Sequence, residues 1–271
     1  MELTGFYKLN IDDRLALIKK ARALSDEETA LLKNSGALSL DIADRMIENV
    51  VGAMHLPFAI ATHFKINKKE MLIPMAIEEP SVVAGACKAA KLTLPNGFTA
   101  SSDEPVMIGQ VQIVNIEDGK KALAAFEKHK KEIFNIAREC AKQMEKYGGG
   151  LKDISAKSIK TARGEMLIAY FDIDVRDAMG ANTVNTVLEG VAPSIANYVG
   201  GTPRLRILSN LAVKRKVYAQ TVWKKDLIKE EAIEGILDAY EFAKNDVYRC
   251  VTHNKGIMNG IGAVALATGQ D

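Results

Sequence analysis

The stretch that decides the fold is "EMLIAYFDIDVRDAMGANTVNTVLEGVAPSIANYV", residues 165–199. Its first part is mostly apolar and ends on aspartate, which is typical of a strand. Beyond it the apolar residues recur with the period of a helix. Asp177 stands before this run and is the expected N-cap of the helix. The expected inward stripe consists of Val184, Val187, Leu188 and Val191.

The pattern on both sides of this stretch repeats the alternation of strand and helix. Upstream, "VMIGQVQIVNI" (106–116) predicts a strand, and one long helix is expected from about Asp118 to Tyr147, ended by three glycines. "AKSIKT" (156–161) and "RLRIL" (204–208) predict two further strands. The order β-α-β-β-α-β is the split βαβ or ferredoxin-like pattern.

The flanking segments have a different character. Three helices, a hairpin around Asn67 and an Ala-rich helix are expected before the turn-rich stretch 95–105. Ser25 and Glu28 have capping-box spacing, and Ile42, Met46, Ile47 and Val50 form the stripe of the third helix. The predicted fold class is α+β, with a large mixed helical and sheet domain (1–105 and 210–271) and an inserted ferredoxin-like domain (106–209). An insertion of this kind creates an interdomain cleft, where ligands often bind.

Composition excludes several classes of protein. The 271 residues are 48% hydrophobic and 26% charged, with a net charge of +2, which is typical of a globular protein and gives no strong field for nucleic acid or an anionic membrane. No apolar run predicts a transmembrane helix, and no signal peptide is recognisable. Cytoplasm is the expected location.

The cysteines and histidines do not predict a metal site. Cys87, Cys140 and Cys250 are far apart, and the four histidines lack metal-ligand spacing. We therefore expect no metal, and we expect the cysteines to be buried apolar residues.

Two stretches place charges in apolar surroundings. Glu78 and Glu79 stand between an apolar strand and an apolar helix. They fit either helix-terminus charges favoured by the macrodipole or a desolvated proton donor with a raised pKa. Lys255 is isolated among Gly, Ile and Met, and fits either a solvated loop or a group that stabilises an oxyanion.

Two further stretches are candidates for ligand contacts. "DVRDAMGANTVNT" (174–186) combines a helix start with small residues, an arrangement that accepts an anion such as a pyrophosphate. Ser209 and Asn210 end a strand, and fit either a turn or amides turned into the cleft. Neither a GxGxxG after a strand nor a P-loop occurs.

At these residues the sequence resembles the class II 3-hydroxy-3-methylglutaryl-CoA (HMG-CoA) reductases, the bacterial and archaeal soluble form. The resemblance rests on motifs that occur in the family's order along the chain. They are "EEPSVVA" (78–84), "YGGGLKD" (147–153), "DVRDAMGANTVNT" (174–186), "LRILSNLA" (205–212), "THNKGIMNG" (252–260) and "ATGQD" (267–271).

The resemblance implies a reaction and its catalytic residues. The family interconverts HMG-CoA and mevalonate plus CoA by two hydride transfers with NADPH or NADH, in isoprenoid metabolism. By the match of motifs, Lys255 would hold the oxyanion, Glu79 would donate a proton, and Asp271 would bridge the two. Ser81, Asn210, Arg249 and Asn259 would surround the hydroxymethylglutaryl group.

The resemblance also implies the cofactor site and the assembly. The inserted domain would bind the nicotinamide cofactor through a segment that contains Asp177, Met179, Gly180 and Asn182. The chain would be an obligate homodimer, with a higher oligomer left open, and the active site would lie at the subunit interface. "ENVVG" (48–52) belongs to the interface segment.

This chain departs from the family pattern at two points. NAD-preferring relatives carry an aspartate twelve positions before Asp153, where this chain has Ala141 followed by Lys142. Without that acid a 2′-phosphate is not repelled, so NADPH is the expected cofactor and NADH the alternative. Family members also continue past Asp271 to a histidine that protonates the CoA thiolate, so we expect weak or no complete turnover from the 271 residues.

Two alternative functions remain open at this point. The chain could be a catalytically incomplete fragment that binds substrate and dimerises. It could also be a ferredoxin-like RNA-binding module that uses the basic run "VKRKVYAQTVWKK" (213–225), although an RNP-like motif is not present.

Overall fold

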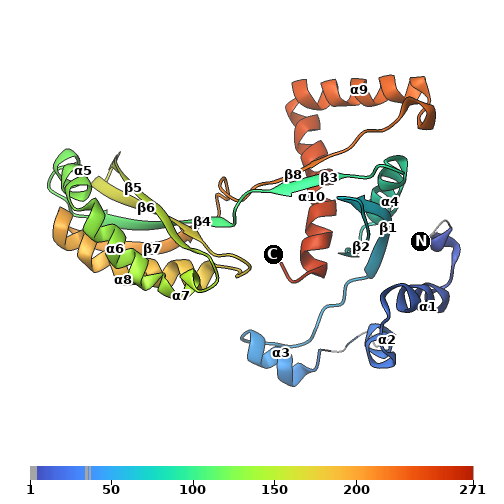
Figure 1. Ribbon diagram of the computed structural model, residues 1–271, viewed down its shortest axis with the longest axis horizontal. Coiled ribbons are helices and arrows are strands. Elements are labelled where there is room, and N and C mark those ends of the chain that lie inside the picture. The colour runs from blue at the N-terminus through green and yellow to red at the C-terminus, as the bar shows by residue number, and fades with distance from the viewer. Residues whose placement is uncertain (1–4, 34–35, 37, 271) are drawn as a thin grey trace. The chain divides into compact units, whose positions relative to one another are not determined.

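The computed structural model describes residues 5–33, 36 and 38–270 (Figure 1). The chain forms two compact units, of which unit 1 comprises Met1–Ala100 and Ala219–Asp271, and unit 2 comprises Ser101–Tyr218. Both boundaries fall inside the short two-stranded sheet of β3 (Thr99–Ser102) and β8 (Val217–Gln220). The sequence instead suggested boundaries near residues 105 and 210.

Unit 1 is a mixture of helices around one β-hairpin. Its remaining elements are η1 (Phe6–Lys8), α1 (Ile11–Arg22), α2 (Asp26–Lys33), α3 (Leu40–Met46), β1 (Phe58–Ile66), β2 (Lys69–Ala76), α4 (Val82–Leu92), η2 (Lys225–Leu227), α9 (Glu230–Asn245) and α10 (Val247–Ala267). α4 packs on β1 and α10 packs on β2. The small core of this unit consists of Ala61, Met75 and Ala263 with their neighbours.

Local sequence signals determine much of unit 1. The predicted capping box forms, with Ser25 Oγ accepting from Glu28 N–H at 3.1 Å and Glu28 Oε2 accepting from Ser25 N–H at 2.7 Å. The hairpin turn expected at Asn67 to Lys69 forms at Asn67 and Lys68, and Lys69 begins β2. Both turn residues adopt positive φ (49° and 69°), as a type I′ turn requires.

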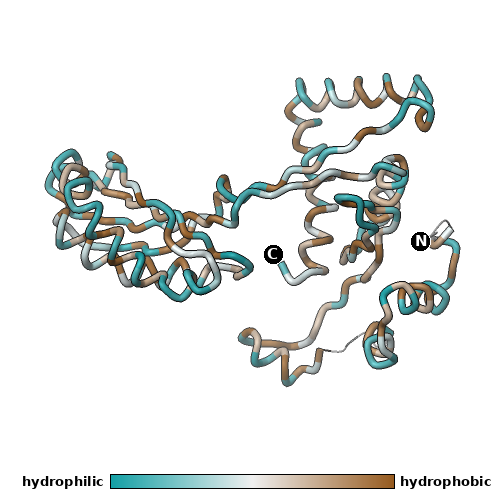
Figure 2. The backbone as a smooth tube through the Cα atoms, viewed as in Figure 1, coloured by the Kyte–Doolittle hydropathy of each residue, from teal (hydrophilic) through white to brown (hydrophobic). Residues whose placement is uncertain are grey.

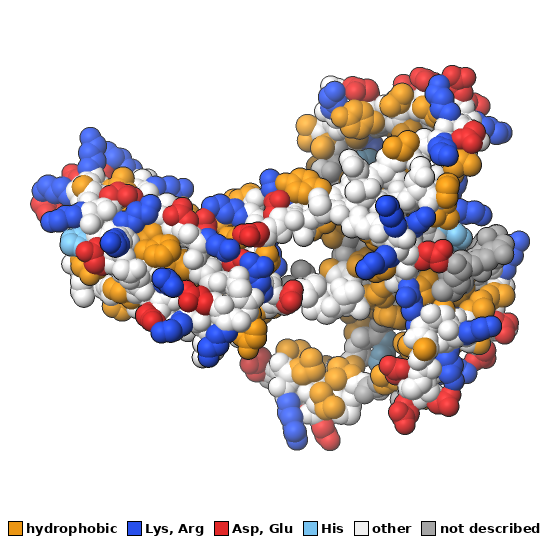
Figure 3. Space-filling view, viewed as in Figure 1, with side chains coloured by type: hydrophobic (Ala, Val, Ile, Leu, Met, Phe, Trp, Pro, Cys, Tyr) orange, Lys and Arg blue, Asp and Glu red, His pale blue; other side chains and the backbone are white. Residues whose placement is uncertain are grey.

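The third helix is shorter than predicted. α3 ends at Met46 because the backbone of Ile47 is extended (φ −144°, ψ 162°), so Ile47 and Val50 do not continue its stripe. Ile42, Met46 and Ile47 are exposed. Figure 2 shows apolar residues in α3 and in the extended segment that follows it, and Figure 3 shows hydrophobic side chains on the surface of α3.

Unit 2 has the predicted β-α-β-β-α-β order. Its elements are β4 (Val106–Val114), α5 (Gly119–Lys128), α6 (Lys130–Cys140), α7 (Lys142–Glu145), β5 (Gly150–Thr161), β6 (Gly164–Asp174), α8 (Ala181–Val199) and β7 (Thr202–Ser209). The sheet order is β5-β6-β4-β7, and every neighbouring pair is antiparallel.

The prediction of one long helix at 118–147 is wrong. The helix is broken at His129 and Ala141, where ψ is 13° and 1°. At the first break the His129 ring stacks on Tyr198 at 4.3 Å between centroids, and at the second Ala141 is buried in the core.

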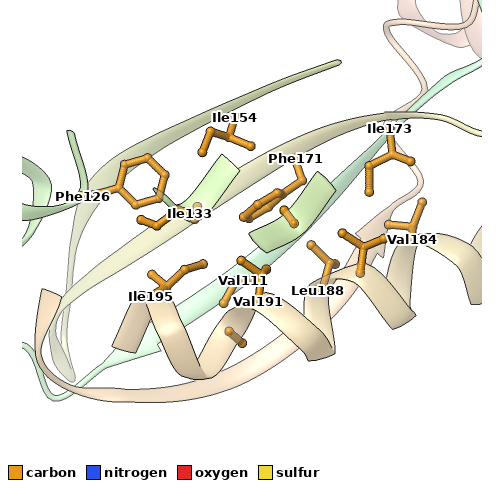
Figure 4. Close-up of a cluster of buried hydrophobic side chains, with 14 of the residues drawn as sticks. Val111, Phe126, Ile133, Ile154, Phe171, Ile173, Val184, Leu188, Val191 and Ile195 are labelled. Carbon is orange, nitrogen blue, oxygen red and sulfur yellow. The ribbon is translucent and has the colours of Figure 1, made fainter. Parts of the chain in front are cut away.

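The core of unit 2 lies between the sheet and its helices. Val111, Phe171 and Ile173 of the sheet are fully buried, as are Phe126 of α5 and Ile133 of α6. Figure 4 shows the sheet residues turned toward Val184, Leu188, Val191 and Ile195 of α8, so the predicted stripe of this helix is confirmed. In the described part of the chain, helices of the length and hydropathy needed to cross a membrane do not occur.

Candidate active site

Three of the residues singled out in the sequence meet in unit 1. Glu79 Oε2 accepts hydrogen bonds from Lys255 Nζ at 2.8 Å and from Asn259 Nδ2 at 2.9 Å. Two motifs more than 170 positions apart, "EEPSVVA" and "THNKGIMNG", thus form one polar cluster, which we call the Glu79 cluster (Glu79, Lys255 and Asn259).

Secondary structure positions each member of the cluster. Glu79 lies in the short turn between β2 and α4. Lys255 and Asn259 are four residues apart on α10 and therefore lie on the same face of the helix. Asp246 caps α10 by accepting from Arg249 N–H at 2.7 Å.

The expectation of a raised Glu79 pKa is wrong for this structure. The hydrogen bond and the positive charge of Lys255 lower the pKa of Glu79, although the little burial present opposes them. The side chains of Glu79 and Lys255 are 44% and 62% exposed, so the desolvation that would raise the pKa is largely missing. Glu79 is here a carboxylate that accepts hydrogen bonds.

The other predicted substrate residues have different outcomes. Ser81 is the N-cap residue of α4, but its backbone is left-handed (φ 73°) and its hydroxyl makes no capping hydrogen bond, so the hydroxyl is exposed beside Glu79. Arg249 lies half-buried in the first turn of α10. Asn210 belongs to unit 2, and Asp271 lies outside the described residues. The roles of Arg249, Asn210 and Asp271 stay predictions.

A cavity of about 1090 Å³ reaches the Glu79 cluster. Its walls come from η1, α1, α2, β1, α4 and the turn before α4, and Glu79 and Ser81 both line it. Its lining is mainly apolar, with cationic side chains around it. Such a space suits an extended, partly apolar ligand that carries negative charge. The cationic residues are Lys8, Arg14, Lys88 and Lys91.

The predicted cofactor segment forms a loop (residues 175–180) and the start of α8 in unit 2. The N-cap of α8 is Gly180, with φ 100°, and not Asp177 as predicted. A Cβ at residue 180 would lie 2.3 Å from Met107 Sδ, so close packing requires glycine here. The helix start has no side-chain cap, and Asp177, Met179 and Asn182 are exposed.

The same segments identify the family of the chain. A family model described as hydroxymethylglutaryl-coenzyme A reductase matches residues 10–271. The chain belongs to this family.

Named relatives and solved structures agree with this assignment. The 3-hydroxy-3-methylglutaryl-coenzyme A reductase of Archaeoglobus fulgidus is 50% identical over 99% of the chain, and a probable reductase of Borreliella burgdorferi is 34% identical over 85% of it. The chain spans 62% and 54% of the lengths of these two relatives. A reductase structure from Streptococcus pneumoniae superposes with a TM-score of 0.93 at 36% identity, covering 100% of this chain and 75% of that one. Another structure from that organism, a class II reductase bound to NADPH in open conformations, gives a TM-score of 0.90.

One residue that the family resemblance assigns to the cofactor site, Ala141, lies inside the core. Ala141 is 1% exposed and belongs to the core of unit 2, so its methyl group cannot contact a cofactor; the prediction of Ala141 as a contact is wrong. Lys142 is exposed and binds Glu139 at 2.6 Å, and this hydrogen bond raises the pKa of Lys142. The role of Lys142 in cofactor binding stays a prediction.

Sequence reasoning missed an ionic cluster in this chain. Arg176 and Lys152 both contact the carboxylate of Asp174 in unit 2. The available signal was an aspartate at the end of a buried strand, and the residues that contact it carry no strong sequence signal. Among the described residues, three or more His, Cys, Asp or Glu side chains do not gather anywhere as a potential metal site.

Proposed function

We propose that this chain performs the HMG-CoA reductase reaction, in which HMG-CoA and mevalonate plus CoA are interconverted by two hydride transfers. The observation that carries this proposal is the Glu79 cluster at the edge of a large cavity in a chain of this family. Because one set of residues serves both directions, the proposal covers mevalonate formation and mevalonate oxidation.

The cluster supports specific roles for its members. The Lys255 ammonium would polarise the thioester carbonyl and stabilise the oxyanion that follows hydride addition. Asn259 orients Glu79 through the 2.9 Å hydrogen bond, and Glu79 would supply a proton to the reduced oxygen. Asp271 would hold Lys255 in place. Arg249 and Asn210 would bind the hydroxymethylglutaryl group, Arg249 through its carboxylate.

The cavity supports the binding mode of the thioester. Its apolar walls suit the chain that links the acyl group to the nucleotide part of CoA, and the four cationic side chains suit phosphate groups. Ser81 lines the cavity beside Glu79 with its hydroxyl unused by the helix cap, so it would contact the acyl group.

For unit 2 we propose a ferredoxin-like cofactor domain. The βαββαβ order and the antiparallel sheet support the fold. The uncapped start of α8 offers backbone N–H groups to a pyrophosphate, with Asp177, Met179 and Asn182 beside it. When bound, NADPH or NADH supplies the hydrides. Lys142 would favour NADPH because its positive charge attracts the negatively charged 2′-phosphate.

For the assembly we propose a homodimer with the active site at the subunit interface. Unit 1 exposes an unusual number of large apolar side chains, which are typical of an interaction surface. The exposed fractions of Val51 and Met54 reach 99% and 88%, and Val251 and Met258 flank Lys255 on α10 at 65% and 57%. The cytoplasm stays the predicted location.

The test combines binding and turnover. The purified chain is titrated with NADPH, NADH and HMG-CoA, and cofactor absorbance is followed in both directions, with the Archaeoglobus fulgidus protein in parallel to validate the assay. Binding of both ligands with hydride transfer supports the proposal. Binding without any hydride transfer favours the alternative of a substrate-binding and dimerising fragment, and binding of neither ligand refutes the proposal.

A further inference from the structure

Two motifs that are distant in the sequence meet at Asp174 in unit 2. Asp174 is the last residue of β6, and its side chain is fully buried. The glycine run 148–150 passes directly over it, because a Cβ at Gly149 would lie 2.5 Å from the Asp174 carbonyl oxygen. Glycine at 149 therefore allows the backbone of one motif to approach the other.

The Asp174 carboxylate fixes the first turn of the loop 175–180. It accepts a hydrogen bond from the backbone N–H of Arg176 at 3.0 Å and another from the Arg176 guanidinium. Arg176 is left-handed (φ 49°), a conformation that costs free energy for a residue with a side chain. The two contacts to Asp174 stabilise this conformation.

A β-bulge brings a second cation to the same carboxylate. β5 pairs Leu151 with Ile173 and Asp153 with Asp172, so Lys152 is an extra residue on its strand. Bulges of this kind redirect a side chain, and Lys152 Nζ lies 3.2 Å from Asp174 Oδ2 and 3.4 Å from Glu104.

The buried ion pairs of Asp174 and the left-handed backbone of Arg176 both cost free energy, so stability alone does not account for them. Burial removes water from both charges of an ion pair, and this desolvation can exceed the gain from their attraction. The left-handed backbone of Arg176 adds conformational strain. Burial alone would raise the pKa of Asp174, but the hydrogen bonds from the Arg176 backbone, Lys152 and the Arg176 guanidinium outweigh it and lower this pKa. Asp174 is therefore a carboxylate held in place by groups from β5 and from the loop.

We propose that Asp174 is a positioning residue of the cofactor site and that it directs the guanidinium of Arg176 to a phosphate group of the dinucleotide. This inference rests on the proposed function, in which unit 2 binds NADPH or NADH. Arg176 donates to Asp174 through one terminal nitrogen, and its side chain is 36% exposed. A guanidinium has several N–H donors in a fork that matches phosphate oxygens. The Nε of Arg176 is buried, so the terminal N–H groups that do not bind Asp174 serve the ligand.

The test compares three single variants by fluorescence titration with NADPH and with NADH. Asp174→Asn keeps the shape of the side chain and removes its charge, and Arg176→Gln removes the phosphate-binding group itself. Both are expected to weaken cofactor binding about tenfold or more, equivalent to about 1.4 kcal/mol. Asp172→Asn is the matched control, because Asp172 is on the same strand and binds only Lys214 among the ion pairs of the described residues. Its dissociation constant is expected to stay within about twofold.

The outcomes separate this inference from the proposed function. Equal losses for both cofactors identify the shared pyrophosphate as the ligand group, and a loss for NADPH alone identifies the 2′-phosphate. HMG-CoA binding should not change in any variant. If Asp174→Asn does not fold, Arg176→Gln carries the test alone. Unchanged binding in Arg176→Gln overturns the inference, whereas a chain that binds neither cofactor before substitution overturns the proposed function as well.

Discussion

Replacing Lys255 with methionine removes the ammonium group from the Glu79 cluster and keeps most of the side-chain length. We expect the rate of hydride transfer to fall by about 100- to 1000-fold, the range for loss of an oxyanion-stabilising group. The folded state should be almost unaffected, because the ion pair of Lys255 and Glu79 is 62% and 44% exposed and exposed pairs contribute little to stability.

The assay has a kinetic and a thermal part. NADPH oxidation in the presence of HMG-CoA gives the rate, and thermal unfolding gives the melting temperature. Lys33→Met is the matched control, since Lys33 is 54% exposed and pairs with Asp12 at 2.6 Å outside the cluster. A Lys255→Met variant that keeps its rate within about threefold would refute the assigned role, and an equal rate loss in both variants would show that the effect is not specific.

The same variant tests the electrostatics of the cluster. Lys255 lowers the pKa of Glu79, so its removal should move this pKa up toward the ordinary value for glutamate, about 4.3. NMR titration of labelled glutamate carboxyl groups, with Glu79→Gln to assign the signal, measures the change. Because the pKa of Glu79 is lowered in the folded chain, its ionisation stabilises the folded state at a pH above its unfolded-state pKa. This stabilisation is lost as the pH falls through the folded-state pKa. An unchanged Glu79 pKa in Lys255→Met would show that Lys255 is not the cause.

Three further substitutions test other parts of the structure. Gly180→Ala should weaken NADPH binding and lower the free energy of unfolding by about 1–3 kcal/mol, because φ of residue 180 is positive and the new Cβ would collide with Met107 Sδ. Urea unfolding measures this free energy, and an unchanged value would contradict the prediction. Met54→Asp should convert the proposed dimer to a monomer in sedimentation experiments, because Met54, 88% exposed in one chain, would place a charge in the proposed interface. A retained dimer would exclude this segment from the interface. The unaltered chain should use NADPH at least as well as NADH, and Lys142→Glu should lower this preference; NADH used about tenfold better by the unaltered chain, roughly 1.4 kcal/mol of discrimination, would refute the cofactor assignment.

Sequence patterns predicted features that depend on neighbouring residues. The Ser25–Glu28 capping box and the Asn67–Lys68 turn were predictable because their hydrogen bonds and backbone angles involve residues within a few positions. The βαββαβ order followed from hydrophobic periodicity. The pairing of Glu79 with Lys255 was suggested only by resemblance to a family, since periodicity carries no information on contacts so distant in the chain.

The errors arise where packing between distant segments decides the outcome. Asp177 looks like an N-cap, but Gly180 takes that position because Val175 and Met107 leave space only for a residue without a side chain. The burial of Ala141 depends on a core built from the sheet and the helices of unit 2, which local sequence does not reveal. Asp174 was missed because its partners come from a bulge and from a loop, neither of which has a strong sequence signal.

The exposure of the Glu79 cluster connects its chemistry to the proposed dimer. Glu79 needs a higher pKa to donate a proton near neutral pH, and desolvation is the change that raises it. Lys255 lies in an apolar stripe of α10 between Val251 and Met258, so a second subunit or a bound thioester that covers this stripe would also remove water from the cluster. We therefore expect the pKa of Glu79 to be higher in the dimer than in monomeric Met54→Asp, and higher again with HMG-CoA bound. Carboxyl NMR titration of both forms measures this difference, and equal Glu79 pKa values in dimer, monomer and complex would show that the proton comes from another group.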